Sequence, residues 1–530
     1  MLEVLVKGPS VSLVDSRDKR EFTESENLGL ASIASFLRGK NISVDLCSFD
    51  TCKSVEEQID KLESNYDIYG FSLFHENVEF VFSAAKRIKE KNPKAIVCAG
   101  SKFATEAADF ILNECHDLDF IVLGDGEFPL LEVAQAYPDL HTITNLTNIK
   151  TRESIKVNHK DVSRVAFENG HWPTAHDFAR NTFGRPSAIA RLYSKRGCTC
   201  YCSFCLLPSK AQKKLKKFSG RPMHDLFHEV LKLNREFGFK AFMIHDCPFD
   251  DAGEMGIQRV EEFCDLLLSH DQPFSFECMI DGKFIDENSV PLIQKMRKAG
   301  FSQIMYLIGS GNEHDEYILK KQRNIRLKES AIDLFEANDV EVMLEFFSYT
   351  PFSTLQSFEN NYHFLTRRKA YVLDYFIYKA PVYYGSDLYL MCREKKLLKP
   401  DYTYKDVFEY AFEEPYFFEV DNFFQNVIRK SQIIHEDFSF HNFVYLCNWL
   451  RALFPEGMKD IMTEVNSIKS KLHTTLLSYF SDVMVKKDLT SSRENFTDFE
   501  STLLNIYKES KLLQMKQLRQ PDIRKYLMRN

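Results

Sequence analysis

The first 140 residues alternate between short apolar runs and longer amphipathic segments. Asn27–Arg38 and Glu76–Lys91 repeat apolar side chains every three or four residues, which predicts helices. The runs between and around them are too short for helices and rich in β-branched residues, which predicts buried strands. These runs are Leu2–Val6, Val44–Phe49, Asp67–Phe74, Ala95–Ala99 and Asp119–Leu123. Strands and helices in alternation predict an α/β domain over residues 1–140, built on a doubly wound parallel sheet.

Such a sheet binds its ligand beyond the carboxyl ends of its strands, so the loops there are candidate binding sites. Glycine in these loops lets the backbone approach a bulky ligand, because it has no Cβ. A plain turn after each strand is the alternative for any one loop. The candidate residues are Ser72, His75, Gly100, Ser101, Gly124, Gly126 and Glu127.

Four of the 13 cysteines lie between Cys198 and Cys205. Cys198, Cys202 and Cys205 have Cys-x3-Cys-x2-Cys spacing, which lets one short loop hold three irons of a [4Fe–4S] cluster. The fourth iron would then lack a protein ligand. Zinc with Cys200 as an added ligand is the alternative, although zinc loops usually supply thiols in two separated pairs. We expect the nine scattered cysteines to be mostly buried small apolar residues.

This cysteine motif, with the aromatic Phe204 before its last cysteine, resembles the signature of the radical S-adenosylmethionine (SAM) superfamily. The segment Tyr66–Phe74 and the loop Gly-Asp-Gly-Glu at 124–127 resemble the cobalamin-binding-like domain that precedes many of these enzymes. The usual form of that loop is Gly-Glu-Gly-Glu. The resemblance implies three cofactors, namely a [4Fe–4S] cluster, SAM and cobalamin. It implies that the candidate loops of the first domain contact cobalamin and that Phe204 packs near the adenine of SAM.

Residues 185–399 resemble the partial TIM barrel of radical SAM enzymes, and residues 141–184 are predicted to connect the two α/β domains. The expected strands are Ala188–Tyr193, a segment from Phe242, Phe274–Asp281, Phe301–Ile308 and Val340–Tyr349. The resemblance makes Glu277 and Ser310 candidates for SAM binding. Relatives often have glutamate where this chain has Gly309, and arginine where it has Met279, so a structural role for Glu277 and Ser310 stays open.

Cobalamin mutases carry an Asp-x-His-x-x-Gly loop whose histidine binds cobalt. The matching loop here, residues 50–55, has neither histidine nor glycine, which argues against histidine ligation from it. His75 is the alternative axial ligand, against an ordinary loop histidine.

From about residue 400 the alternation stops, and helical periodicity predicts a mainly helical domain over 400–530. Its predicted helices are Asn442–Leu453, Gly457–Phe480 and Asp498–Leu513. Many aromatic residues precede them, which is typical of a packed helical core. A lid over the barrel mouth is the alternative.

Composition limits the partners and the location. With 68 basic and 76 acidic residues the formal charge is −8, which gives no overall attraction to nucleic acid or an anionic membrane. The sequence shows neither a secretion signal nor a run of apolar residues long enough to cross a bilayer, so we expect a cytoplasmic protein. The basic stretch Lys210–Lys217 is predicted to be a solvated loop; docking of a flavodoxin- or ferredoxin-type reductant is the alternative.

The resemblance implies a cobalamin-dependent radical SAM methyltransferase. One SAM would methylate cobalt, and a radical from a second SAM would activate an unactivated substrate carbon that takes the methyl group. The same domains in relatives also serve oxidations, cyclisations and rearrangements, so this is the second hypothesis. A non-catalytic iron–sulfur protein is the third, although an electron carrier needs a fully ligated, shielded cluster. A peptide or a specialised metabolite is the expected substrate.

Overall fold

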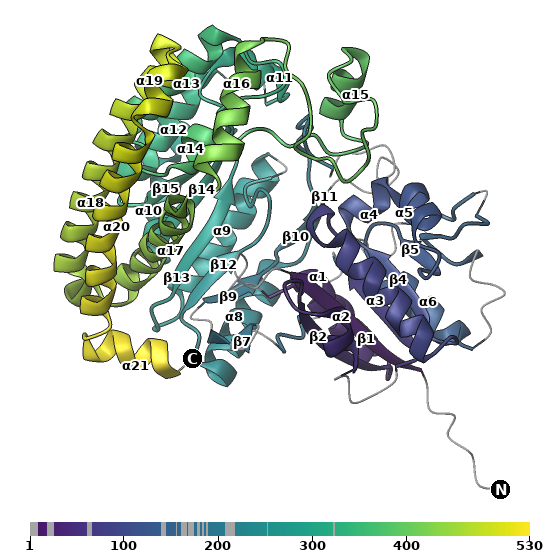
Figure 1. Ribbon diagram of the computed structural model, residues 1–530. Coiled ribbons are helices and arrows are strands. Elements are labelled where there is room, and N and C mark those ends of the chain that lie inside the picture. Colours follow the sequence, from purple (N-terminus) through teal and green to yellow (C-terminus); the bar gives the residue numbers. More distant parts are fainter. Residues whose placement is uncertain are drawn as a thin grey trace, which may run out of the picture.

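The computed structural model shows two α/β units that face each other, with a bundle of helices packed on the second (Figure 1). It describes residues 9–17, 26–60, 66–138, 145–154, 156–160, 167, 174–177, 181–182, 185–186, 189–206, 218–251, 253–321 and 324–529. Within these ranges, no helix combines the length and the apolar character needed to span a membrane. The predicted basic loop Lys210–Lys217 lies outside them.

The first unit is a six-stranded sheet of order β2-β1-β3-β4-β5-β6, parallel except for the antiparallel edge strand β6. Its strands are β1 (Ser10–Arg17), β2 (Ser43–Asp50), β3 (Ile68–Ser72), β4 (Ile96–Gly100), β5 (Phe120–Val122) and β6 (Ile149–Lys150). Its helices are α1 (Leu28–Arg38), α2 (Val55–Asp60), α3 (Val78–Lys91), α4 (Lys102–Glu106), α5 (Ala108–Glu114) and α6 (Glu127–Ala136). Apolar cores on both faces confirm the predicted doubly wound sheet.

Two details of this unit differ from the prediction. The predicted strand Leu2–Val6 lies outside the described residues, and the strand between β2 and β3 is β1, in which five of the eight side chains are polar. Strand β6 also lies beyond residue 140, within the predicted 141–184 connection, and it extends the sheet to residue 150. An edge strand of two residues is too short to produce a periodic pattern.

The second unit is an open parallel barrel of order β15-β14-β13-β12-β9. Its strands are β9 (Ile189–Leu192), β12 (Ala241–Ile244), β13 (Ser275–Ile280), β14 (Phe301–Gly309) and β15 (Glu341–Phe346). The helices that follow the strands are α8 (Met223–Phe237), α9 (Glu254–Leu268), α10 (Val290–Lys298), α11 (Glu313–Ile318), α12 (Ile325–Ala337), α13 (Leu355–Arg367), α14 (Asp374–Ile377) and α15 (Asp387–Glu394). A single parallel bridge between Tyr349 and Lys379 continues the barrel past β15. The predicted partial barrel is confirmed.

The C-terminal region is helical, as predicted. Its helices are α16 (Tyr416–Phe423), α17 (Gln432–Leu453), α18 (Pro455–Ser481), α19 (Leu489–Glu494), α20 (Phe496–Gln517) and α21 (Pro521–Arg529). These helices share one hydrophobic core with the barrel, in which the Phe376 and Phe480 rings stack with centroids 4.8 Å apart. They therefore form part of the barrel unit and have no separate core.

The C-terminal helices contact the amino ends of the barrel strands. Arg451 in α17 donates to the Ser302 carbonyl at the start of β14, and Tyr526 in α21 accepts from the Ala241 amide at the start of β12. Lys469 in α18 pairs with Glu341, the first residue of β15. These contacts place α17, α18 and α21 at the end of the barrel opposite its mouth, so these three helices do not form the alternative lid.

Candidate functional site

The cysteine loop lies at the carboxyl end of β9, directly after the short strand β10 (Lys195–Gly197), which pairs with β11 (Phe218–Gly220). Gly197 turns the chain into the loop with φ of 78°, a left-handed conformation that favours glycine. Cys198, Cys202 and Cys205 are each half-buried. The β10–β11 hairpin lies between the two α/β units (Figure 1).

Buried acidic side chains hold the start of this loop. Asp251 accepts hydrogen bonds from the Thr199 amide (2.9 Å) and hydroxyl, and it pairs with Lys195 Nζ at 3.0 Å. Lys195 Nζ also donates to the Gly197 carbonyl at 2.9 Å. Asp246, after β12, accepts from the Ser194 and Lys195 amides. The loop is therefore fixed to the next strand before its first cysteine.

The second half of the loop is fixed through Ser203. Its amide donates to the Leu319 carbonyl at 3.0 Å and its hydroxyl to the Ile318 carbonyl at 2.7 Å. Phe204 is buried, with its ring centroid 4.9 Å from that of Phe347 in a small apolar cluster. The structure therefore gives Phe204 a packing role at the cluster loop; its predicted contact with adenine remains an expectation.

The thiols of the loop have different electrostatic surroundings. A hydrogen bond from the Cys200 thiol lowers the pKa of Cys198 against the opposing effect of burial, while the same bond and burial raise the pKa of Cys200. Burial raises the pKa of Cys202 to about 12, and the nearby Lys321 ammonium opposes that rise. The Cys200 backbone amide also donates to Cys198 Sγ at 3.3 Å.

The donor set suits an iron–sulfur cluster. Three half-buried thiols on one loop lie beside two buried ammonium groups, Lys195 and Lys321, which favour the thiolate form that binds iron. Within the part of the chain that the structure describes, no three His, Cys, Asp or Glu side chains gather at one position suited to a single metal ion.

The barrel lumen, the inner side of the barrel, is lined by alternate residues of the strands. Ala190, Leu192, Phe276 and Cys278 belong to the outer hydrophobic core, so their neighbours in β9 and β13 face the lumen. By the same alternation, the lumen-facing residues include Arg191, Tyr193, Met243, His245, Glu277, Met279, Gln303 and Met305.

The two SAM candidates in the barrel have different environments. Glu277 is fully buried on the lumen side, where its Oε2 accepts from Gln303 Nε2 at 2.9 Å and burial raises its pKa to about 8. Ser310 is also fully buried, but its hydroxyl is hydrogen-bonded to Asn361 (3.0 Å) and Asn312 (3.0 Å). The structure therefore assigns Ser310 to an internal polar network; Glu277 remains a lumen residue.

The cobalamin candidates lie at the carboxyl ends of the sheet, as predicted, but several have internal partners. Ser101 caps α4 by accepting from the Ala104 amide and donates to the Leu73 carbonyl, while Ser72 is buried. The Gly124 amide donates to Thr105 Oγ1. Gly100 packs on Val122, where a Cβ would meet the valine Cβ at 3.3 Å.

Gly126 and Glu127 also have close neighbours within the chain, and their predicted contact with cobalamin remains an expectation. A Cβ on Gly126 would lie 2.7 Å from Ile33 Cδ1, so close packing of α1 requires glycine there. Glu127 is buried and pairs with Arg196, while its Oε1 accepts from Ser32 Oγ at 2.9 Å. Glu127 therefore joins the first unit to the cluster loop.

His75 lies between the two units, half-buried. Its ring centroid is 6.2 Å from Phe103 in the sheet unit and 5.9 Å from Tyr383 in the barrel unit. Burial lowers its pKa, which favours the neutral imidazole that binds metals. Its position at the end of β3 agrees with the prediction, and its role as a cobalt ligand remains an expectation.

Four residues that position the loop were not predicted from the sequence: Lys195, Arg196, Asp251 and Lys321. The signal available was the Lys-Arg pair directly before Gly197 and the cysteine motif. The prediction for the scattered cysteines holds for six of them, which are buried; Cys52 and Cys247 are exposed, contrary to it.

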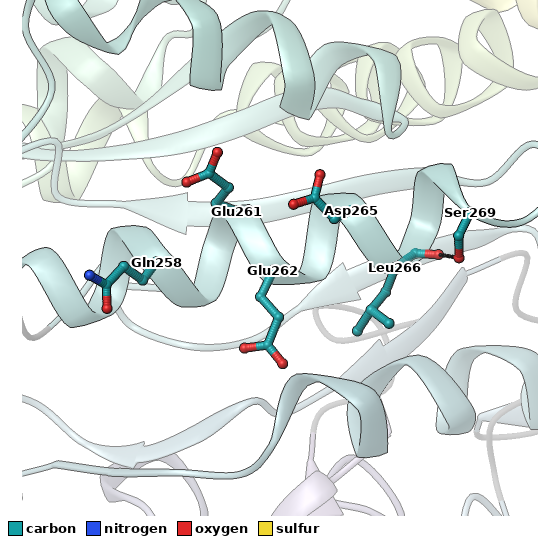
Figure 2. Close-up of a pocket in the computed structure, with 6 residues that line it drawn as sticks. All are labelled: Gln258, Glu261, Glu262, Asp265, Leu266 and Ser269. Atoms are coloured by element: carbon teal, nitrogen blue, oxygen red, sulfur yellow. Dashed lines mark hydrogen bonds between the residues drawn. The ribbon is translucent and has the colours of Figure 1, made fainter.

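A separate acidic hollow lies on the outer helix α9 (Figure 2). Its side chains come from one helix and its C-terminal cap, and Glu261 and Asp265 both pair with Lys295 of α10. The hollow is on the outside of the barrel, away from the strand ends that carry the cysteine loop, and it belongs to the solvated surface.

Comparison with known proteins bears on both units. Residues 22–134 match the family described as B12 binding domain. The whole fold is similar to the cobalamin-dependent S-adenosylmethionine radical enzyme OxsB, solved with aqua-cobalamin and S-adenosylmethionine bound: the TM-score is 0.72 over 97% of this chain and 80% of OxsB, with 16% identity. The chain has the fold of a cobalamin-binding radical SAM enzyme. The predicted resemblance is confirmed.

Two further relatives agree with this fold. The radical SAM methyltransferase TsrM from Kitasatospora setae, solved with cobalamin and a [4Fe–4S] cluster, gives a TM-score of 0.58 over 73% of this chain and 78% of TsrM, with 13% identity. The uncharacterized methyltransferase PH0819 of Pyrococcus horikoshii is 23% identical over 239 residues, 43% of this chain. That match spans 50% of PH0819, so it does not show that this chain has the activity of the whole PH0819 protein.

Proposed function

We propose that this chain is a cobalamin-dependent radical SAM enzyme that methylates an unactivated carbon of a peptide or a specialised metabolite. The observation that supports this most strongly is the half-buried three-thiol loop at the barrel mouth, joined by Arg196 and Glu127 to a sheet that matches the B12 binding domain. OxsB and TsrM combine these two units with cobalamin in their solved structures.

In this proposal Cys198, Cys202 and Cys205 hold the cluster, and cobalamin lies at the carboxyl ends of the first sheet, near Gly124 and His75. When bound, the cluster with SAM supplies a 5′-deoxyadenosyl radical, and cobalamin supplies the methyl group. The residues of this chain position those groups and exclude water. Asp251 and Ser203 fix the loop, and the C-terminal helices close the far end of the barrel.

The second candidate is a cobalamin-binding radical enzyme that catalyses an oxidation, a cyclisation or a rearrangement, because one fold serves several chemistries. The test is product analysis of reconstituted protein loaded with cobalamin and given SAM, reductant and candidate substrates. Methyl transfer predicts a corrinoid absorption band and S-adenosylhomocysteine in proportion to methylated product. Substrate turnover with 5′-deoxyadenosine but no S-adenosylhomocysteine would support the second candidate instead.

The proposal includes a reductant of the flavodoxin or ferredoxin type and a cytoplasmic setting that supplies its electrons; docking of the reductant on Lys210–Lys217 is the alternative to a solvated loop there. A titration of the oxidised protein with reduced flavodoxin, at low and high salt, tests this part. Electrostatic docking predicts that salt slows the electron transfer.

A further inference from the structure

Arg191 is an unusual residue for the wall of a barrel. It lies in the middle of β9, between Ala190 and Leu192, which both belong to the outer core, so its side chain faces the lumen. Within the described part of the chain, its guanidinium group has no hydrogen bond or ion pair. Burial lowers its pKa to about 10, so the group is still positively charged at neutral pH.

Further donors lie around the same space. His245, at the end of the neighbouring strand β12, has no partner for Nδ1 among the described residues. Burial and the positive charges of Arg191, Lys102 and Arg17 lower the pKa of His245 to about 3. Lys102 and Arg17 belong to the sheet unit, so cationic groups of both units lie near this lumen position.

Acceptors lie on the third barrel strand and its neighbour. Glu277 and Gln303 are fully buried and bonded to each other, yet Oε1 of each has no hydrogen-bond partner within the described ranges. Glu277 opposes the effect of burial on the pKa of Arg191, although the two groups do not form an ion pair. A ligand on the inner side of the barrel therefore meets the half-buried Arg191, whereas the Glu277 and Gln303 side chains are fully buried.

We propose that Arg191, with His245 and Lys102, binds an anionic group, a phosphate or a carboxylate, of the substrate. This inference rests on the proposed function, because it assigns the lumen to the substrate of that reaction. It narrows the substrate class to small anionic metabolites or peptides with a free carboxylate.

The energetics favour a binding role over a structural one. An unpaired charge inside a protein is costly, and replacing it with an apolar side chain of similar size is neutral or stabilising when its only effect is on folding. A residue that stabilised the barrel would instead have partners in the folded chain. An arginine that has no partner in the folded chain lowers the stability of the protein, and this is typical of a residue that binds a ligand.

The experiment uses the full chain with its cluster and cobalamin, and measures the melting temperature by circular dichroism. Phosphate, pyrophosphate and succinate are the probes, with sodium chloride at matched ionic strength as the blank. We expect one or more of these anions to raise the melting temperature saturably. In Arg191→Met the apparent affinity is expected to fall about tenfold or more, while the melting temperature without anion stays equal or rises.

Two variants make the comparison specific. Arg235→Met removes an exposed arginine of α8 and is expected to leave the anion response intact. Arg191→Lys keeps the positive charge but removes the planar guanidinium group, which can donate two parallel hydrogen bonds to an anion. We therefore expect a smaller rise in melting temperature with anion than in the wild type. It also provides the comparison if Arg191→Met does not fold. An anion response that is absent in the wild type, or equal in the wild type and the Arg191 variant, overturns the proposal.

Two further measurements show whether Arg191 binds the substrate, SAM or cobalamin. If saturating SAM abolishes the response, or Arg191→Met binds SAM at least tenfold more weakly, the group recognised is the carboxylate of SAM and the substrate assignment is wrong. If Arg191→Met loses bound cobalamin, Arg191 binds cobalamin, and its assignment to the substrate is again wrong. The assay needs no turnover, so anion binding without 5′-deoxyadenosine formation would contradict the proposed function and leave the binding site standing.

Discussion

Arg196 lies two residues before Cys198 and donates from both terminal nitrogens to the carboxylate of Glu127, with Nη1 2.9 Å from Oε2. Glu127 is the first residue of α6, which follows β5 of the sheet unit. The side chains are 11% and 2% exposed, and the Arg196 guanidinium also lies 4.9 Å from the Phe167 ring centroid. This buried pair connects the cysteine loop to the unit that matches the B12 binding domain.

Glu127→Gln is expected to lower the free energy of unfolding by about 3 kcal/mol, because Arg196 stays buried but loses the carboxylate that both its terminal nitrogens contact and keeps the more distant Asp125, at 3.8 Å. The measurement is urea unfolding of the purified chain. Glu90→Gln is the matched control: it removes a surface pair with Arg87 on α3 and should cost less than about 1 kcal/mol. Equal losses in the two variants would contradict a structural role for the Glu127 pair.

Asp251→Asn is expected to weaken cluster binding by about 10- to 100-fold, because the loop loses the charged acceptor for Lys195 and Thr199. Loss of iron to a chelator, followed over time in reconstituted protein, measures this effect. Glu254→Gln changes an exposed carboxylate at the start of α9 and should retain iron as the wild type does. Unchanged iron retention in Asp251→Asn would show that the anchor does not support the cluster.

Substitution of Cys198, Cys202 or Cys205 by alanine is expected to abolish the [4Fe–4S] cluster, since each supplies one of three iron ligands. Cys200→Ala should keep it, because Cys200 lies outside the Cys-x3-Cys-x2-Cys spacing and its backbone amide, which alanine retains, donates to Cys198 Sγ. Iron and sulfide content, with Mössbauer spectra of the reconstituted proteins, distinguish these outcomes. Cluster loss in Cys200→Ala with retention in one of the other three variants would reverse our ligand assignment.

The stability of the fold is expected to depend on pH through His176. It is buried between Glu26 (2.9 Å) and Glu229 (2.8 Å); burial lowers its pKa, but these two carboxylates outweigh burial and raise it to about 9. The protonated histidine therefore stabilises the fold fully below pH 6.5, and this contribution is lost as the pH rises through 9. Relative to His176→Gln, the wild type should be about 3 kcal/mol more stable at pH 6, with the difference shrinking by pH 10.

Urea unfolding of both proteins across this pH range measures the difference. His363→Gln is the control, because His363 is exposed on α13 and lies 3.7 Å from Glu359. A pH-independent difference between the wild type and His176→Gln would contradict the proposed charge state.

The sequence predicted the elements whose burial is regular. The strands β3 and β4 are almost entirely apolar and buried, and the cysteine spacing singled out Cys198, Cys202 and Cys205 without structural information. Strand β1 was missed because its polar side chains form hydrogen bonds that only the folded sheet supplies, as between Ser10 and Asp67. The pattern of hydrophobic residues along the chain does not predict such hydrogen-bond partners.

The residues that fix the cysteine loop could not be predicted either, because their partners lie far away in the sequence. Glu127 and Arg196 are 69 positions apart, and Lys321 approaches the cysteine loop from beyond β14. Ser310 was a candidate from its loop, but its hydroxyl bonds to Asn361, 51 residues away. Local spacing identifies a loop that binds a cluster; the partners that fix it depend on how distant strands pack.

Formation of 5′-deoxyadenosine tests the central claim most directly. Cluster-reconstituted protein is incubated anaerobically with SAM and dithionite, and the product is quantified by mass spectrometry, with Cys202→Ala and Cys200→Ala treated in parallel. We predict 5′-deoxyadenosine from the wild type and Cys200→Ala and none from Cys202→Ala. Wild-type protein that carries a full [4Fe–4S] cluster and yet forms no 5′-deoxyadenosine would contradict the account.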